Sequence, residues 1–346
     1  MVTKSTVVLV TGLLAVSACK PETEGRASLV VGPRILAIRS QPVEAKPGAA
    51  VAWDALRVSP DGQSAGVELD WALCLEPKPI AQPGPVALRC LAPSGEALDP
   101  LGVGDSVSGT VPQNVCRIFG PTPPEPEPGQ PALRPADPDT TGGYYLPVRV
   151  LSPGPEYFIG VTRIQCGLGG ANQEQAVEYA RRTRPNENPA LASLHLVRGG
   201  TAQEILPGGS AAVSPGETIV LRAAWADCPV EPRCGDGICG DAEDTTNCAE
   251  DCAAPVGCTG SEPYLYFDPG TRTLVPRREA IRVSWFATAG EFDHDRTGRA
   301  EAEASSPQSE NAWTAPDAAG TVKVWVVVRD DRGGVGWGAY EIIVGS

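Results

Sequence analysis

The residues of this chain that could act as a nucleophile are few, and the best pattern for one is poorly placed. Residues 62–66 (GQSAG) match the G-x-S-x-G pattern, in which the serine stands on a sharp turn between a strand and a helix. Here the pattern follows Pro60 and Asp61, and no helical segment comes after it. We therefore interpret Ser64 as part of a plain turn, and a secreted serine hydrolase that uses Ser64 remains the competing function.

Histidine, the commonest general acid and base, occurs only twice. His195 lies in the alternating segment 192–197 and is interpreted as a strand residue. His294 lies between Asp293 and Asp295 in a polar stretch, which favours a solvated loop, with a metal ligand as the alternative. No pair of carboxylates stands out as an acid–base couple, and no glycine-rich phosphate loop precedes a helix. The sequence therefore gives no positive indication of catalysis.

Carboxylates crowd a cysteine-rich stretch over residues 234–252, where glycines permit tight turns. Calcium binds six to eight hard oxygen ligands at flexible distances, which carboxylates and backbone carbonyls supply. The spacing is not that of an EF-hand loop, because Asp236 has no acidic partner at the next two alternate positions. Two interpretations stay open, a calcium-binding loop and a disulfide knot with solvated acids. The candidate calcium ligands are Asp236, Asp241, Glu243, Asp244 and Asp251.

The composition sets the class of protein in which these residues must be positioned. The chain has 346 residues, including 39 Gly and 35 Pro, which makes it rich in turns and disfavours a helical bundle. This length and a hydrophobic content of 42% predict two domains with cores of their own. The formal net charge of −14 argues against a nucleic-acid partner, which requires a basic face.

The first residues form an export signal. After Lys4, the apolar run 7–16 has the length of a signal-peptide core and is shorter than the ~20 residues that a membrane span needs. Residues 16–19 (VSAC) resemble the bacterial lipobox. The resemblance implies lipid attachment to Cys19 and cleavage before it. Residues 1–18 are then a lipoprotein signal peptide, and residues 19–32 a lipidated tether.

The resemblance to the lipobox also indicates a location in the cell. Lys20 follows the lipidated cysteine where the inner-membrane retention signal would be Asp, which favours the outer membrane of the cell envelope. A cysteine that carries several acyl chains, palmitate among them, anchors stably where a single chain would not.

Ten cysteines remain once Cys19 is set aside, and an even number in an exported chain predicts disulfide bonds. None has C-x-x-C spacing, so neither a thioredoxin-like site nor a zinc ribbon is indicated. The ten are Cys74, Cys90, Cys116, Cys166, Cys228, Cys234, Cys239, Cys248, Cys252 and Cys258.

An internal repeat relates the two halves of the chain. Residues 45–56 and 213–224 each place a Pro-Gly turn before an alternating strand, and residues 67–72 and 281–286 each carry a tryptophan within a second such strand. The turns lie 168 residues apart and the tryptophans 214, so the second copy carries 46 extra residues between these strands. The last six cysteines fall inside that excess.

Both copies resemble immunoglobulin-like (Ig-like) β-sandwich domains of the wider superfamily, since the antibody-type cysteine pair is absent. Segments 144–150 and 157–165 are the expected late strands of copy one, and segments 321–328 and 338–344 form a closing hairpin in copy two. We therefore predict an all-β protein with two Ig-like β-sandwich domains. The first spans 33–184, with a proline-rich loop at 121–139, and the second spans 185–346, with a disulfide-rich insertion at 228–258.

Three local questions remain open. Segment 121–139 is too rich in proline for a sheet interior and is interpreted as an exposed loop, with a ligand for aromatic grooves as the alternative. Segment 171–183 can form a helix or a last strand. Residues 234–252 resemble the C-G-D-G-x-C modules of surface proteins of myxobacteria. Cys228 and Cys258 bracket that module and can close its base, and its four inner cysteines allow three pairings.

These observations predict a lipid-anchored cell-envelope protein with a non-catalytic role in binding, adhesion or scaffolding. Its expected partners are the membrane, through the lipid on Cys19, and an unknown protein or glycan of the envelope. A periplasmic accessory subunit of a secretion or polysaccharide machine is a further alternative.

Overall fold

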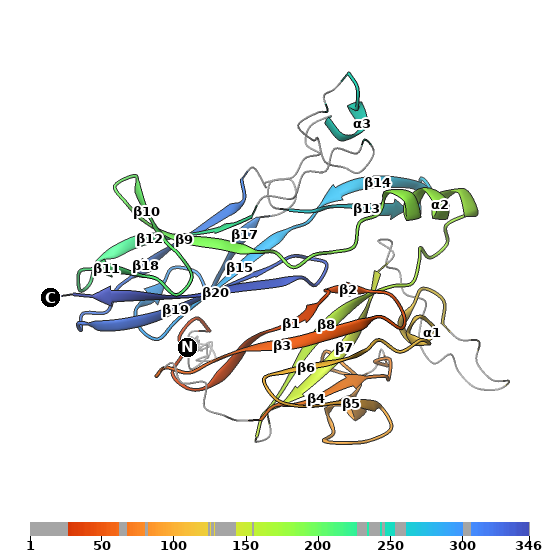
Figure 1. Ribbon diagram of the computed structural model, residues 1–346, viewed down its shortest axis with the longest axis horizontal. Helices are drawn as coiled ribbons and strands as arrows, with labels where there is room; N and C mark the ends of the chain where they lie inside the picture. The colour runs from red at the N-terminus through yellow and green to blue at the C-terminus, as the bar shows by residue number, and fades with distance from the viewer. Residues whose placement is uncertain are drawn as a thin grey trace, which may run out of the picture.

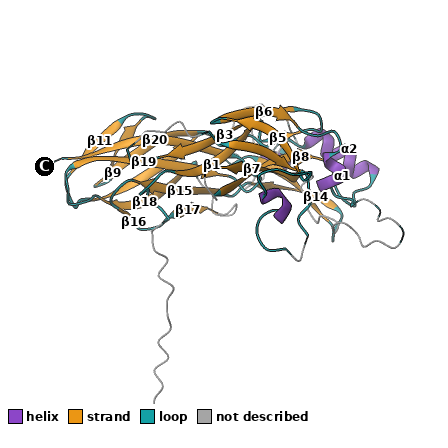
Figure 2. Cartoon of the chain, turned by 90° about the horizontal axis from the view of Figure 1, so that it is seen from below, coloured by secondary structure: helices purple, strands orange, loops and turns teal. Residues whose placement is uncertain are grey.

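Two β-sandwiches make up most of the protein, the first red to yellow-green and the second green to blue in Figure 1. The computed structural model describes residues 27–61, 68–79, 82–123, 125, 128, 143–153, 156–226, 234, 243, 246–252, 261–299 and 306–345. Strands form almost the whole body, and helices α1 and α2 lie together at the end opposite the C-terminus (Figure 2).

The first sandwich packs a sheet of three strands against a sheet of five. The order of the small sheet is β1 (Arg34–Gln41), β3 (Ala50–Val58), β6 (Ser106–Thr110). The order of the large sheet is β2 (Glu44–Ala45), β8 (Tyr157–Gln165), β7 (Gly143–Leu151), β4 (Asp70–Cys74), β5 (Leu98–Val103). Three short helices accompany them, namely η1 (Leu88–Leu91), α1 (Val115–Phe119) and α2 (Gln173–Arg182).

The second sandwich packs two five-stranded sheets. The order of one is β10 (Thr201–Ile205), β9 (Leu191–Arg198), β12 (Thr218–Trp225), β18 (Gln308–Thr314), β16 (Glu291–Phe292). The order of the other is β11 (Ser210–Val213), β20 (Val335–Val344), β19 (Gly320–Arg329), β15 (Ile281–Ala287), β17 (Arg296–Arg299). Between β12 and β15 the chain adds α3 (Ala249–Cys252) and the hairpin of β13 (Pro263–Asp268) and β14 (Thr273–Arg278).

The two sandwiches share one topology, as the repeat predicts. In each, a short early strand runs parallel to the last strand, β2 beside β8 and β11 beside β20. The strands that follow the Pro-Gly turns are β3 and β12, and those with the buried tryptophans Trp71 and Trp285 are β4 and β15. The prediction of an all-β protein with Ig-like sandwiches is therefore confirmed. The β13–β14 hairpin was not anticipated.

Three buried tryptophan rings pack in the two cores, and each has a hydrogen-bond partner for its indole N–H. Trp53 and Trp71 are fully buried in the first sandwich, and each donates a hydrogen bond, Trp53 to Thr162 Oγ1 (2.7 Å) and Trp71 to the carbonyl of Gly104 (2.8 Å). Trp285, buried in the second core, donates to Thr297 Oγ1 (2.8 Å). Each ring therefore adds apolar area to its core without leaving its N–H unpaired.

Segment 171–183 is the helix α2. The side chain of Asn172 accepts a bond from the backbone N–H of Gln175, and the side chain of Gln175 accepts one from that of Asn172, both at 2.8 Å. This capping box satisfies two N–H groups that a helix start leaves free, which favours the helix over the alternative of a last strand.

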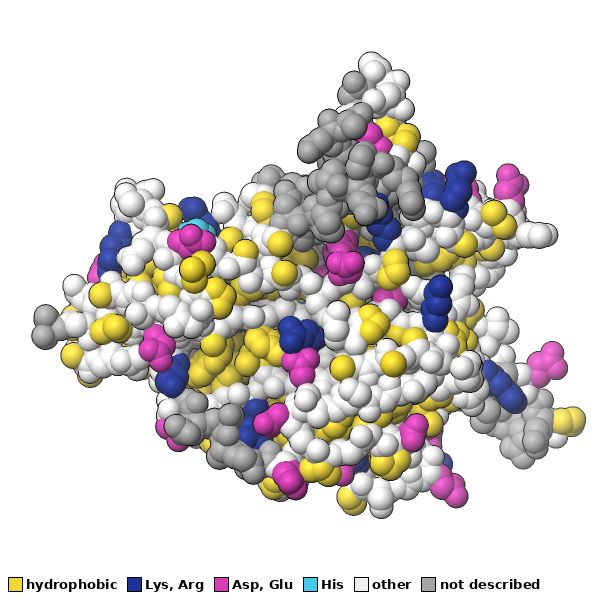
Figure 3. All heavy atoms as spheres, viewed as in Figure 1, with side chains coloured by type: hydrophobic (Ala, Val, Ile, Leu, Met, Phe, Trp, Pro, Cys, Tyr) yellow, Lys and Arg dark blue, Asp and Glu magenta, His cyan; other side chains and the backbone are white. Residues whose placement is uncertain are grey.

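The sandwiches contact each other through a third apolar cluster. Val327 is fully buried there, and Trp325 and Leu36 are 6% and 7% exposed. Figure 3 shows hydrophobic side chains in the crevice between the sandwiches, whereas charged side chains are scattered singly or as opposite pairs over this face. The remaining members of the cluster are Val30, Ala37, Val58, Phe286 and Val335.

The end of the predicted tether pairs with the second sandwich. The N–H of Val30 donates to the carbonyl of Ala287 (2.8 Å), and the N–H of Ala287 donates to the carbonyl of Ser28 (2.9 Å). The N–H of Ser28 donates to Asp295 Oδ1 (3.1 Å), and Val30 is fully buried. Residues 28–30 are therefore fixed beside β15.

Several predicted features lie outside the described residues. These are the signal peptide 1–18, Cys19, Ser64, most of segment 121–139 and most of the insertion 228–258. In the part of the chain that is described, no helix is long and apolar enough to cross a membrane.

Candidate binding surface

The disulfide bonds fix several of the loops around the sheets. Cys74 pairs with Cys90, Cys116 with Cys166 and Cys234 with Cys248, with Cα atoms 5.4, 5.4 and 5.5 Å apart. The Cys234–Cys248 bond occurs in one of the three pairings that the four inner cysteines of the insertion allow. Cys252 is also disulfide-bonded, whereas Cys228, Cys239 and Cys258 lie outside the described residues.

The histidines are found in strand and loop surroundings. His195 lies on β9, with its Nε2 atom 3.0 Å from Ser193 Oγ. The loop of His294 is closed on Asn311, whose side chain bonds both the N–H (3.3 Å) and the carbonyl (2.6 Å) of His294. The neighbouring Asp295 accepts the N–H of Ser28. The His195 ring, the His294 backbone and the Asp295 carboxylate therefore each have a hydrogen-bond partner in the surrounding strands and loops.

The candidate calcium ligands are not brought together in the described part of the chain. Asp236, Asp241 and Asp244 lie outside it, Asp251 lies in α3, and Glu243 precedes that helix. Among the described residues, no group of three or more His, Cys, Asp or Glu side chains is placed to hold a metal ion. The calcium loop and the plain knot both remain predictions.

An apolar groove lies over the outer face of the large sheet of the first sandwich. Strands β7 and β8 are central in this sheet, and their inward side chains, such as Leu146 and Ile164, pack in the core. Because successive strand residues face opposite sides, Tyr145 and Pro147 of β7 and Val161 of β8 face outward. These three side chains are apolar or aromatic, so the outer face of the sheet is apolar over this part of β7 and β8.

The groove has a volume of about 690 Å³ and a mostly apolar lining that includes four aromatic rings. Tyr157, the most exposed of its rings, has 42% of its surface accessible. Among the described residues of the lining, two side chains are charged, Glu76 and Lys78. The other rings are Phe119, Tyr145 and Phe158, and the prolines are Pro85 and Pro147.

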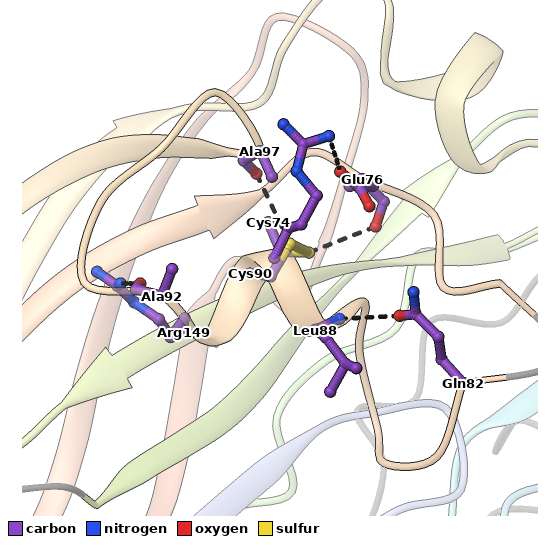
Figure 4. The surroundings of a disulfide bond; sticks show 9 residues. Cys74, Glu76, Gln82, Leu88, Cys90, Ala92, Ala97 and Arg149 are labelled. Carbon is purple, nitrogen blue, oxygen red and sulfur yellow. Dashed lines mark hydrogen bonds and ion pairs between the residues drawn. A yellow bond between two sulfur atoms is a disulfide. The ribbon is translucent and has the colours of Figure 1, made fainter.

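One wall of the groove is held by the Cys74–Cys90 disulfide (Figure 4). The bond fixes η1 against β4, and Glu76 accepts a bond from Arg89 Nη1 at 2.9 Å. Arg149, whose side chain is 1% exposed, reaches from β7 to the carbonyl of Ala92 and thereby ties the same segment to the sheet. The wall is therefore rigidly attached to the strands that form the floor.

The opposite side of the groove is held by the second disulfide. Phe119 is the last residue of α1, and Cys116 in that helix is bonded to Cys166 just after β8. The ring of Tyr145 is positioned by Arg163, whose Nη1 donates to the tyrosine Oη at 3.3 Å. Both ends of the lining are therefore set by covalent or buried polar contacts.

The outward positions of two predicted strands indicate the groove in the sequence itself. The segments 144–150 and 157–165 were predicted as strands, and five of their eight outward positions are apolar or aromatic, the other three being Arg149, Arg163 and Gln165. A half-exposed strand normally alternates between apolar and polar residues. An outer face of this kind indicates a covered or binding surface.

Comparison with known proteins adds no argument about the fold or the groove. No protein-family model matches the chain, and no curated protein matches it. It is similar to the fibronectin(III)-like modules of Clostridium thermocellum CbhA, with 10% identity over 92% of this chain and 91% of that one and a TM-score of 0.23. It is also similar to the Yersinia pseudotuberculosis adhesin InvE, with 9% identity over 90% and 58% of the two chains and a TM-score of 0.20. At these TM-scores the similarity carries no argument about function.

Proposed function

We propose that the chain is a lipid-anchored cell-envelope protein that binds another envelope protein, without catalysis, through the groove on its first sandwich. The observation that carries this proposal is the exposed aromatic lining over β7 and β8. A concave apolar site that carries aromatic rings is a candidate site for binding a partner.

The chemistry of the lining favours a protein partner. Tyrosine and phenylalanine are enriched at protein interfaces, and the charged groups stand at the rim, where Glu76 is already paired with Arg89. A saccharide presents many hydroxyl groups and would need more polar partners than this groove supplies. The backbone of β7 is paired with β8 on one side and with β4 on the other, so a ligand over β7 contacts its side chains.

The anchor in this proposal is the lipid on Cys19. Eight residues, 20–27, separate it from Ser28, where the chain is fixed beside β15, and the nine residue-to-residue steps from Cys19 to Ser28 span at most about 30 Å. The second sandwich is then held close to the membrane. The groove belongs to the first sandwich and is free to meet a protein of the envelope.

The proposal is tested by sedimenting purified residues 20–346 with washed envelope fragments of the cells that make the protein. We expect saturable binding that Tyr157→Asp lowers at least tenfold. The matched control is Leu206→Asp, since Leu206 is 62% exposed on the second sandwich, and this variant should bind like the wild type.

The class of partner is decided by treating the fragments. Protease treatment should abolish sedimentation, and digestion of the polysaccharide should not. Equal binding by wild type and Tyr157→Asp would overturn the groove as the contact surface. Binding that survives protease and is lost on polysaccharide digestion would replace the protein partner with a glycan.

A further inference from the structure

Charged side chains of both sandwiches meet at the junction between them. The side chains of Glu44, Arg163, Glu279 and Arg332 are 2–4% exposed, so they are largely removed from water. Glu262 is 23% exposed at the edge of the group. The junction cluster consists of Glu44 and Arg163 of the first sandwich and Glu262, Glu279, Asp330 and Arg332 of the second.

Arg332, in the turn between β19 and β20, lies at the centre of the cluster. Its Nε atom is 2.6 Å from Glu279 Oε1, and its Nη2 atom is 3.0 Å from Glu262 Oε2. These two glutamates flank the β13–β14 hairpin. Its Nη1 atom is 3.9 Å from Oε2 of Glu44, which Arg163 Nε also contacts at 3.1 Å. One guanidinium therefore links the first sandwich, the second sandwich and the insertion hairpin.

The linker between the sandwiches is part of the same network. The backbone N–H of Asn186 donates to Glu44 Oε2 (2.8 Å), and its side-chain amide lies 3.3 Å from both oxygens of Asp330. The N–H of Glu187 donates to Glu262 Oε2 (3.1 Å). Separation of the sandwiches would break these bonds together.

The cluster holds more negative than positive charge. Its four carboxylates, when ionised, outnumber its two guanidinium groups by two. An excess of buried charge is costly, and a buried carboxylate relieves it by keeping its proton. Among the described residues, Tyr145 of β7, Tyr179 of α2, Glu187 of the linker and Tyr264 of β13 also face the cluster.

We propose that this junction is a proton-operated latch, in which the Glu262–Glu279 pair retains a proton while the sandwiches and the hairpin are packed together, and loss of that proton loosens the junction. The latch does not depend on the groove or on the lipid anchor. It does lie close to the groove, since Tyr145 lines the groove and also contacts Arg163.

Burial supports this assignment. It raises the pKa of Glu262 to about 7 and raises the pKa of Glu279 as well, although Arg332 opposes both shifts. In the separated state an exposed glutamate has its ordinary pKa of 4.5. The packed state therefore binds more protons between these values, so packing is most favourable below pH 4.5 and weakens as the pH rises to 7. Between pH 5 and pH 8 the packing equilibrium constant should fall roughly 70-fold.

Hydrogen–deuterium exchange tests the latch at the linker. The amides of Asn186 and Glu187 are bonded directly to Glu44 and Glu262, so protection of peptide 184–189 reports the junction. Its exchange is measured at pH 5 and pH 8, corrected for intrinsic rates and compared with peptide 321–328 of β19 in the second core. We expect wild-type protection of 184–189 to fall roughly 70-fold over this range, while β19 stays protected.

Two variants locate the proton. Glu262→Gln with Glu279→Gln imitates the protonated pair, so its junction should keep its protection at pH 8 and change less than tenfold. The control is Glu310→Gln, which removes a carboxylate from an ion pair of β18 at 2.7 Å from Arg222 and should behave as the wild type. Wild-type protection that is flat from pH 5 to pH 8 would overturn the latch, whatever the variants do. So would a Glu262→Gln, Glu279→Gln double variant that keeps the wild-type slope.

Discussion

Removal of Arg332 should destabilise the protein more than removal of any exposed arginine, and acid should restore part of the loss. Arg332→Leu deletes the contacts to Glu279 (2.6 Å), Glu262 (3.0 Å) and Glu44 (3.9 Å) and fills part of the space with apolar atoms. Breaking a buried ion pair by removing one partner costs about 3–5 kcal/mol, because the other charge stays buried and unpaired. We expect a loss of this size in the free energy of unfolding at pH 8.

The assay is urea denaturation followed by tryptophan fluorescence, at pH 8 and at pH 5. Burial already raises the pKa of Glu262 and Glu279 despite Arg332, so without Arg332 these acids should be protonated more readily. The penalty should therefore shrink at pH 5. Arg332→Lys keeps a charge but loses the fork that reaches several carboxylates, so its cost should be intermediate.

The matched control is Arg222→Leu. Arg222 pairs with Glu310 at 2.7 Å on an exposed face, and such pairs contribute about 0–1 kcal/mol. If Arg332→Leu costs no more than Arg222→Leu at pH 8, the reasoning about the junction is refuted. A penalty that is equal at pH 5 and pH 8 would refute its electrostatic part alone.

Three further predictions follow from other parts of the molecule. Trp325→Ala removes a ring from the apolar contact between the sandwiches, so it should lower the free energy of unfolding by about 3 kcal/mol and raise the radius of gyration in X-ray scattering. An unchanged radius of gyration would argue against this contact as the main link between the sandwiches. The double variant Cys74→Ser, Cys90→Ser opens a loop of 16 residues, so it should lower the free energy of unfolding by about 3 kcal/mol in thermal denaturation and weaken envelope binding. Normal binding by this variant would show that the groove wall does not need the disulfide. Cys19→Ala should abolish incorporation of radioactive fatty acid, and a labelled variant would exclude Cys19 as the lipidation site.

Local patterns were enough to predict the sandwiches. A Pro-Gly turn sets the start of a strand, and alternation around Trp71 and Trp285 sets which face is buried, so both features are visible within about ten residues of sequence. Segment 171–183 was predicted as either a helix or a strand, although the three-residue spacing of Asn172 and Gln175 is the sequence pattern of the capping box that begins its helix.

The junction could not be predicted in this way. Glu44 precedes a Pro-Gly turn, and Arg332 lies in a Gly-rich turn between two strands, where charged residues are usually solvated. They meet only because the two sandwiches pack and the β13–β14 hairpin brings Glu262 and Glu279 to the same place. Burial of these charges is a tertiary property. The β13–β14 hairpin lies in the part of the second copy that holds the 46 extra residues, and the cysteines of that part gave no indication of paired strands.

The proposed binding role is tested most directly by photo-crosslinking in intact cells that make the protein. A photoreactive phenylalanine analogue is placed at Tyr157 in the groove or, as the control, at Leu206 on the second sandwich. We predict a discrete adduct with one protein from position 157 that is absent from position 206 and is lost when Tyr145 is also changed to Asp. No adduct from position 157, or the same adduct from both positions, would contradict the groove as the site of binding.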